Sequence, residues 1–192
     1  MLTELITDRL SLRPSTVADV SELLTIWNDR GVNRHLFDGK PLTREDVERL
    51  LKAIEVDGAP GIGSWSVRWR GAPEIIGSAA LMRVSYAAEL EPRLRGLCEP
   101  AIALRESLWG RGLGTEILHR LIAHAFDVAA LGEIAAAVDL GNVTSQRLVR
   151  AAGFQELSRV DGVLGPVTTF LLRRPEPAGA ASQPAHDHRP LH

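Results

Sequence analysis

The stretch WGRGLGTE, residues 109–116, places a glycine at every second position directly before an apolar-periodic segment. Glycine inside a helix costs roughly 1 kcal/mol relative to alanine. Three glycines at the mouth of a helix therefore indicate a need for unusual dihedral angles or for close approach to the peptide groups. The first N–H groups of a helix lack intrahelical partners, and the helix dipole favours an anion beside them. The stretch predicts a phosphate-binding loop.

Two common nucleotide-binding motifs do not fit this stretch. A P-loop ends in Gly-Lys-Ser/Thr, whereas Gly114 is followed by Thr115 and Glu116. A dinucleotide fingerprint needs its first glycine directly after a strand and the spacing GxGxxG. Here five residues, 105–109, intervene and the spacing is GxGxG. From this stretch alone, a plain glycine turn into a helix stays open as the alternative.

Composition narrows the class of protein. The chain has 192 residues, of which 45% are hydrophobic and 24% charged, as in an ordinary globular domain. Its formal net charge of −2 argues against a nucleic-acid partner. No apolar run is long enough to span a membrane, and the N-terminus lacks a signal-peptide core. The single cysteine, Cys98, excludes an internal disulfide framework, is interpreted as a buried thiol, and fits a cytoplasmic location.

The first half of the sequence alternates strand and helix patterns. Thr16 with Asp19 and Thr43 with Asp46 each have the spacing of a capping box and predict the starts of two helices. Alternating apolar residues predict a first strand that ends at Pro14 and an antiparallel pair at 64–70 and 75–84.

The second half predicts a strand–helix–strand unit and a closing hairpin. The expected elements are a polar loop at 85–93, a strand at 96–104, a long helix after the glycines, a strand at 134–140, a short helix from Asn142 to Gly153, and two strands flanking Asp161-Gly162. The strand–helix–strand order implies one parallel pair in a mostly antiparallel sheet. We expect one domain at 1–174 and a disordered Pro/Ala/His-rich tail at 175–192.

The order and spacing of two motifs resemble the GNAT acetyltransferase superfamily. These are the glycine loop and the segment that opens with Asn142-Val143-Thr144-Ser145 and closes on Ala152-Gly153-Phe154. The likeness covers about residues 2–174. The opening TDRLSLRPSTVADV, and Trp109 where most of the superfamily has Arg or Gln, most resemble the branch that includes ribosomal-protein N-terminal alanine acetyltransferases. The implied fold is α/β (α+β), with about seven strands, one splayed parallel pair and about four helices.

The resemblance implies acetyl-CoA as co-substrate and no metal. In the splayed gap, the pantetheine arm would pair with the backbone like an added strand, and the loop amides would take the pyrophosphate. The residues expected to bind acetyl-CoA are Ile102, Ala103, Leu104, Trp109, Gly110, Arg111, Gly112, Leu113, Gly114, Thr115, Asn142 and Ser145. For Asn142 an ordinary helix N-cap is an equal alternative.

Glu99 is the candidate general base, because related sequences often place a glutamate in the strand before the loop. A carboxylate in a cleft has a raised pKa and can accept a proton. Ser145 is the candidate hydrogen-bond donor to the leaving thiolate, since the position where many members have tyrosine holds Val149. Tyr86 is the only tyrosine in the chain. His119 and His124 are five residues apart, and both are interpreted as surface residues.

The identity of the amine acceptor is what the sequence determines least. Trp27, His35, Phe37 and Trp65 are candidates for its pocket, with core packing as the alternative for each. Three hypotheses stay open: acetylation of a protein N-terminal α-amine, acetylation of a small-molecule amine such as an antibiotic, amino acid or polyamine, and a non-catalytic acyl-CoA-binding module. A homodimer is possible.

Overall fold

The computed structural model describes residues 2–37, 39–56, 59–84, 86–162 and 165–175. Within them lie eight strands: β1 (Leu5–Ile6), β2 (Leu10–Pro14), β3 (Gly63–Trp69), β4 (Ile75–Arg83), β5 (Cys98–Leu104), β6 (Glu133–Asp139), β7 (Gln155–Gly162) and β8 (Gly165–Arg173). The α-helices are α1 (Val20–Trp27), α2 (Arg30–Leu36), α3 (Arg44–Val56), α4 (Tyr86–Leu90), α5 (Leu113–Asp127) and α6 (Val143–Ala151). The 3-10 helices are η1 (Val17–Asp19), η2 (Pro92–Leu94) and η3 (Glu106–Leu108).

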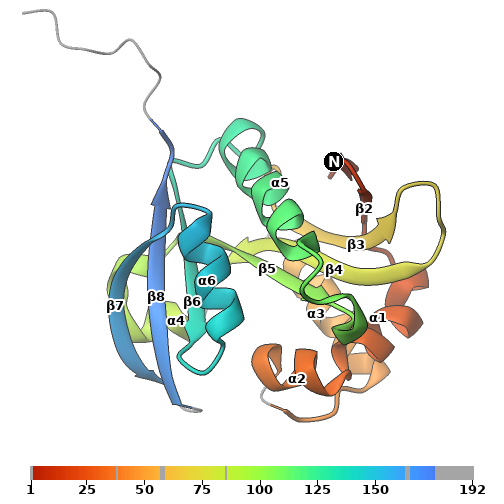
Figure 1. Cartoon of the computed structure of the whole chain (residues 1–192), viewed down its shortest axis with the longest axis horizontal. Helices are drawn as coiled ribbons and strands as arrows, with labels where there is room; N and C mark the ends of the chain where they lie inside the picture. The colour runs from red at the N-terminus through yellow and green to blue at the C-terminus, as the bar shows by residue number, and fades with distance from the viewer. Residues whose placement is uncertain (1, 38, 57–58, 85, 163–164, 176–192) are drawn as a thin grey trace, which may run out of the picture.

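All eight strands belong to one sheet, in the order β1-β2-β3-β4-β5-β6-β8-β7. The neighbours are antiparallel except for β5 and β6, which run parallel and share the single registered pair Cys98↔Ile134. By contrast, β4 follows β5 from Gly77↔Leu104 to Arg83↔Cys98. Figure 1 shows β5 and β6 diverging beyond their common start, with α5 and α6 on the viewer's side. The predicted mixed sheet with one splayed parallel pair is confirmed.

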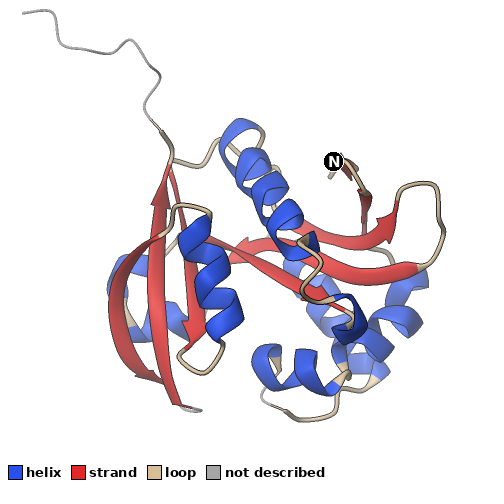
Figure 2. Ribbon diagram, viewed as in Figure 1, coloured by secondary structure: helices blue, strands red, loops and turns tan. Residues whose placement is uncertain are grey.

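The predicted counts of about seven strands and about four helices were too low. β1 is a two-residue strand, too short to show alternation, and pairs with β2. α2 has few apolar residues to mark a period, and α4 with η2 occupies the predicted polar loop at 85–93. Figure 2 draws these short helices in blue, with α4 behind β7 and β8. The predicted turn at Asp161-Gly162 was also wrong, because both residues pair within the β7–β8 ladder.

The longest helix follows its predicted apolar stripe. In α5, Ile117, Leu118, Leu121 and Ala125 are buried against β4 and β5. The capping box at the start of α3 is also formed: the Asp46 N–H donates to Thr43 Oγ1 at 3.2 Å, and the Thr43 N–H donates to Asp46 Oδ2 at 2.8 Å. Local sequence therefore fixes where these two helices begin and which face they bury.

Three apolar clusters divide the core between the two faces of the sheet. The largest lies between the sheet and α5 and includes Trp65, which is 0% exposed. A second joins α1 and α3 to the opposite face of β4 and β5, through Val20, Leu23 and Ala103. A third packs α4 and η2 on β6 and β8. The predicted tail at 175–192 lies, beyond Pro175, outside the described residues.

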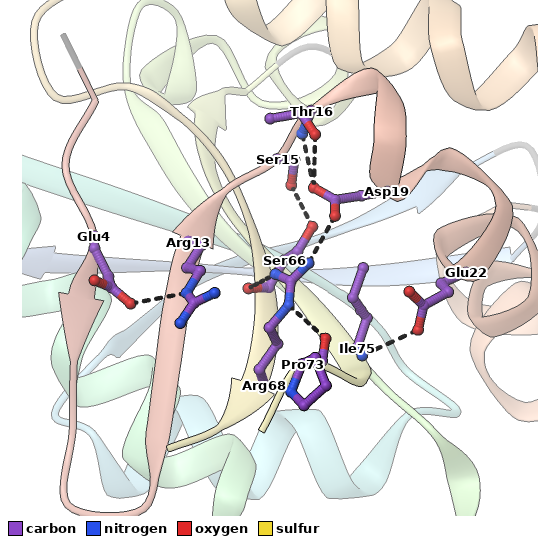
Figure 3. A network of polar contacts seen from close by, with 10 residues as sticks. All are labelled: Glu4, Arg13, Ser15, Thr16, Asp19, Glu22, Ser66, Arg68, Pro73 and Ile75. Atoms are coloured by element: carbon purple, nitrogen blue, oxygen red, sulfur yellow. Dashed lines mark hydrogen bonds and ion pairs between the residues drawn. The ribbon is translucent and has the colours of Figure 1, made fainter. Parts of the chain in front are cut away.

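A polar network fastens α1 to the sheet (Figure 3). Asp19 Oδ2 accepts from the Thr16 N–H at 2.9 Å, and Asp19 Oδ1 accepts from Arg68 Nη2 at 2.7 Å. Burial acts to raise the pKa of Asp19, but these hydrogen bonds outweigh it and hold that pKa below its ordinary value. Arg68 also donates to the Pro73 carbonyl at 2.9 Å. The network holds the start of α1 against β3 and the β3–β4 turn.

The interpretation of His124 as a surface residue was wrong. It is 1% exposed, its Nε2 lies 2.8 Å from the Gly61 carbonyl oxygen, and it meets the Trp65 ring edge-on at 5.2 Å. The loop before β3 packs on α5 and offers a backbone acceptor, which a sequence period cannot reveal. His119 is exposed, as predicted.

Candidate active site

Two of the three loop glycines have backbone angles that other residues rarely adopt. Gly110 has φ of +75° and Gly112, the N-cap of α5, has φ of +76°. Gly114 lies within the first turn of α5, where an added Cβ would lie 3.7 Å from Leu148 Cδ2 of α6. The first two glycines allow the chain to turn sharply into α5. Because the third glycine has no side chain, no Cβ lies between the first turn of α5 and Leu148 of α6. Leu113, Gly114 and Thr115 occupy the first turn, whose amides have no intrahelical acceptor.

Two residues of the β1–β2 turn brace this loop, and the sequence analysis did not single them out. Arg9 Nε contacts Glu116 Oε2 at 2.6 Å, and Arg9 Nη1 donates to the Arg111 carbonyl at 3.1 Å. The Thr7 hydroxyl donates to Glu116 Oε1 at 2.5 Å. Desolvation acts to raise the pKa of Glu116, but the bonds from Thr7 and Arg9 hold it below its ordinary value. An ionised carboxylate beside the loop is thus paired with a guanidinium.

Trp109 connects the end of β5 to α2. Its indole Nε1 donates to the Leu104 carbonyl at 2.8 Å. Its ring lies so close to Gly31 that a Cβ there would fall 2.7 Å from Cη2. The side chain is nevertheless 43% exposed. The Leu104 carbonyl oxygen, which belongs to a residue expected to bind the pantetheine arm, therefore already accepts a hydrogen bond from Trp109.

A cleft of about 580 Å³ passes through the opening between β5 and β6. On the α5–α6 face its walls include Leu118, Asn142, Ser145 and Leu148. On the other face they include Trp27 and Phe37, which pack at a ring-centroid distance of 5.2 Å. Ile102 and Ala103 of β5 also line it, whereas Leu104 is not among its walls. The cleft joins the two faces of the sheet at the point where the strands separate.

Glu99 of β5 is one of the residues that line this cleft, and its side chain is half-buried. Desolvation raises the pKa of Glu99 to about 7, although a backbone hydrogen bond from Ala137 of β6 acts to lower it. A carboxyl with this pKa exchanges protons readily near neutral pH. A cleft position and a pKa near neutrality are two properties that the predicted role of general base requires.

Asn142 and Ser145 lie together at the N-terminus of α6. Asn142 Oδ1 accepts the Ser145 N–H at 3.1 Å, which is the N-cap interaction left open as an alternative. Both residues also line the cleft, as does Val149 one turn further along. The cap fixes the start of α6, so the Ser145 side chain is held at the cleft wall.

Of the four residues predicted for the acceptor pocket, three line the cleft and one lies in the hydrophobic core. Trp27, His35 and Phe37 line the cleft, and the Trp27 indole N–H donates to Ser78 Oγ at 2.8 Å. Trp65 is a core residue. Asp139, which the sequence analysis did not single out, ends β6 with its Oδ2 3.7 Å from His35 Nδ1. An acidic residue near the end of a mostly apolar strand of the parallel pair was the available signal for it.

The chain matches the acetyltransferase (GNAT) domain over residues 9–155, most of its length. It belongs to the GNAT acetyltransferase family. The chain is 25% identical to p20, an uncharacterized N-acetyltransferase of Bacillus licheniformis, over 91% of this chain and 98% of the relative. It is 30% identical to an L-methionine sulfoximine/L-methionine sulfone acetyltransferase of Pseudomonas paraeruginosa, over 76% of this chain and 80% of the relative.

Solved structures show the same fold. A Bordetella pertussis protein assigned to the GnaT family has a TM-score of 0.76 at 23% identity, covering 88% of this chain and 98% of that one. RimL, a ribosomal-protein alpha-N-acetyltransferase solved with coenzyme A, has a TM-score of 0.70 at 13% identity, covering 88% and 97%. The family is thus established and the enzyme is an acetyl-CoA-dependent acyltransferase, whereas the ribosomal-protein branch is not singled out.

No group of three or more His, Cys, Asp or Glu residues within the described ranges could hold a metal ion. No helix in the described part of the chain is long and apolar enough to cross a membrane.

Proposed function

We propose that this GNAT enzyme acetylates a primary α-amine by direct attack in a ternary complex. The observation that carries the proposal is the cleft that passes between β5 and β6, with Glu99 among the residues that line it. The donor would bind from the α5–α6 face, along residues 102–104 and the glycine loop. The acceptor would enter from the face that Trp27 and Phe37 line.

The proposed acetyl transfer requires only a proton acceptor and a hydrogen-bond donor from the protein. The acceptor nitrogen attacks the thioester carbonyl, a C–N bond forms, the C–S bond breaks, and the nitrogen loses a proton. Glu99 takes that proton, because its pKa of about 7 leaves roughly half of it ionised at neutral pH. The hydroxyl of Ser145 donates a hydrogen bond to the departing thiolate, which is stable enough to leave without full protonation.

An α-amine suits a base of this strength better than a lysine side chain. With a pKa near 8, roughly a tenth of an α-amine is neutral at pH 7, compared with below about a thousandth of a lysine side chain. A protein N-terminus and an amino acid with a free α-amine both meet this condition.

For the first candidate acceptor, a protein N-terminal α-amine, the support is the likeness of the opening segment and Trp109 to the ribosomal-protein branch. A specific observation favours a second candidate, a small-molecule α-amine. The relative that is 30% identical is named for L-methionine sulfoximine and L-methionine sulfone, and this chain covers 80% of it. Both candidates use the same base and the same donor site.

Release of coenzyme A thiol from acetyl-CoA, measured against a panel of peptides, amino acids, aminoglycosides and polyamines, tests the proposal. We expect acetyl-CoA to raise the melting temperature and at least one α-amine to accelerate thiol release. Binding without transfer to any amine would favour the non-catalytic acyl-CoA module. Absence of binding would overturn the donor site as well.

A further inference from the structure

Most of the side chains that build the acceptor half of the cleft are apolar, with Ser64, Ser78 and His35 as uncharged polar or titratable exceptions. From the sheet come Ala80 and Met82 of β4, and Met82 stands directly opposite Glu99 in the β4–β5 register. The helices add Trp27, Phe37, Leu50, Ala53 and Ile54. A bound acceptor therefore meets hydrocarbon and aromatic rings on most sides once its amine lies beside Glu99.

Few charges are available to an acceptor in this cleft. The charged or titratable side chains among its described walls are His35, Arg83, Glu99 and Asp139. Asp139 lies 3.7 Å from His35, and Arg83 Nη1 donates to the Gly96 carbonyl at 3.0 Å. Glu99 is the proton acceptor of the proposed reaction. Apart from Glu99, Asp139 is thus the one carboxylate among the described walls, and a second ammonium group that does not reach it would enter a mostly apolar space without a partner, which is costly.

We infer that the acceptor is an α-amine whose body is predominantly apolar and carries no second positive charge, and that polycationic amines are poor acceptors. This inference rests on the proposed function and specifies its substrate class. The same chemistry is offered by an amino-acid derivative with an apolar side chain and by a peptide whose first residue is apolar. Each additional buried methylene is worth about 0.8 kcal/mol, or roughly fourfold in kcat/KM.

A matched acceptor series tests the inference on the wild-type enzyme. The series is glycinamide, alaninamide, norvalinamide, norleucinamide and phenylalaninamide, with lysinamide as the charged counterpart of norleucinamide, and with spermidine and kanamycin as polycations. We expect kcat/KM to climb through the uncharged series and norleucinamide to exceed lysinamide by about a hundredfold at the α-amine. Free leucine, leucinamide and the tripeptide Leu-Gly-Gly then separate a small-molecule source from a chain terminus.

A carboxylate placed in the cleft wall should weaken the preference for the uncharged acceptor. Ala53 is an exposed wall residue of α3, so Ala53→Glu should leave the fold intact while adding a carboxylate to the cleft. We expect the norleucinamide-to-lysinamide ratio to fall at least tenfold. The neighbouring Lys52→Gln makes the same net charge change outside the walls and should leave the ratio unchanged. Leu50→Glu, deeper in the wall, should act more strongly in the same direction.

The outcomes separate the inference from the proposed function. A wild-type enzyme that acetylates lysinamide, spermidine or kanamycin as well as norleucinamide overturns the inference and leaves the acetyltransferase intact. An equal change of the ratio in Ala53→Glu and Lys52→Gln also overturns it, because a general charge effect would then explain the preference. If no amine is acetylated, the proposed function fails and the inference fails with it.

Discussion

In the proposed mechanism, Glu99 serves the reaction at a cost to the stability of the fold. Its carboxyl lies where β5 leaves β6, and the desolvation that raises its pKa to about 7 is the property that makes it a usable base. The same desolvation means that ionised Glu99 is less stable in the folded protein than in water. Activity and stability should therefore respond in opposite directions when this residue is changed.

The kinetic prediction is that Glu99→Gln lowers turnover by roughly 10²–10³, because the amide keeps the shape but accepts no proton. The loss should shrink as the pH rises, since neutral amine becomes abundant. Acetyl-CoA affinity should hardly change. Ser145→Ala should cost less, because a thiolate leaves without full protonation. Steady-state rates from pH 6 to 9 measure this, with the exposed Glu45→Gln as control. Identical pH–rate profiles for parent and Glu99→Gln would remove the base assignment.

Arg9 is expected to support the predicted donor site through Glu116 and the loop, without contacting the donor itself. Its guanidinium pairs with Glu116 in the first turn of α5 and bonds the Arg111 carbonyl. Without it, an ionised carboxylate would face the anionic pyrophosphate at the helix N-terminus, a repulsion worth about 1–2 kcal/mol in a partly buried setting. We expect Arg9→Met to raise the KM for acetyl-CoA about fivefold to thirtyfold and to change kcat little.

The matching controls identify the charge as the cause. Arg13→Met removes an arginine of β2 that pairs with Glu4 instead, and it should leave the KM for acetyl-CoA unchanged. Adding Glu116→Gln to Arg9→Met removes the uncompensated carboxylate and should recover most of the affinity. If the double variant binds acetyl-CoA no better than Arg9→Met, the electrostatic account is wrong and Arg9 only shapes the loop.

At the scale of the element, the loop and α5 show what sequence could and could not predict. The glycine spacing and the apolar stripe identified the loop, the helix and the parallel strands around it, because each leaves a local period or a backbone requirement. The brace of Arg9 on Glu116 joins residues more than 100 positions apart, and no local pattern marks it. The short elements β1, α2 and α4 were missed for the related reason that their own residues are too few to show a period.

The loop prediction is that Gly112→Val abolishes the rise in melting temperature caused by acetyl-CoA. Valine at a φ of +76° costs about 1–2 kcal/mol, and the chain would relieve it by moving the amides of the first turn of α5. Gly71→Val is the matched control, since Gly71 has φ of +78° with nothing within 4 Å of its added Cβ, in the β3–β4 turn. Both variants should lose similar stability, but only Gly112→Val should lose the ligand-induced shift measured by thermal denaturation. An unchanged shift would remove the loop from the donor site.

At the scale of the whole molecule, two buried groups on different faces of the sheet oppose each other in their effect on stability. The pKa of Glu99 is raised from 4.5 to about 7, so the folded state binds more protons than the unfolded state in that range. Stability from this group is present below pH 4.5 and is lost as the pH rises toward 7. The pKa of His124 is lowered from 6.5 chiefly by burial, so its contribution is present above pH 6.5 and is lost as the pH falls.

The two slopes have opposite signs in the parent between pH 4.5 and 6.5, and single variants should separate them. In Glu99→Gln, stability should rise with pH across this range, by at most about 1.4 kcal/mol per pH unit for the one remaining proton. In His124→Gln, whose amide can still donate to the Gly61 carbonyl, stability should fall with pH. The double variant should be flat again, and the exposed His119→Gln should behave like the parent. Urea unfolding at half-unit pH intervals gives these slopes, and if neither single variant differs from the parent, the two groups are not perturbed by burial as the fold requires.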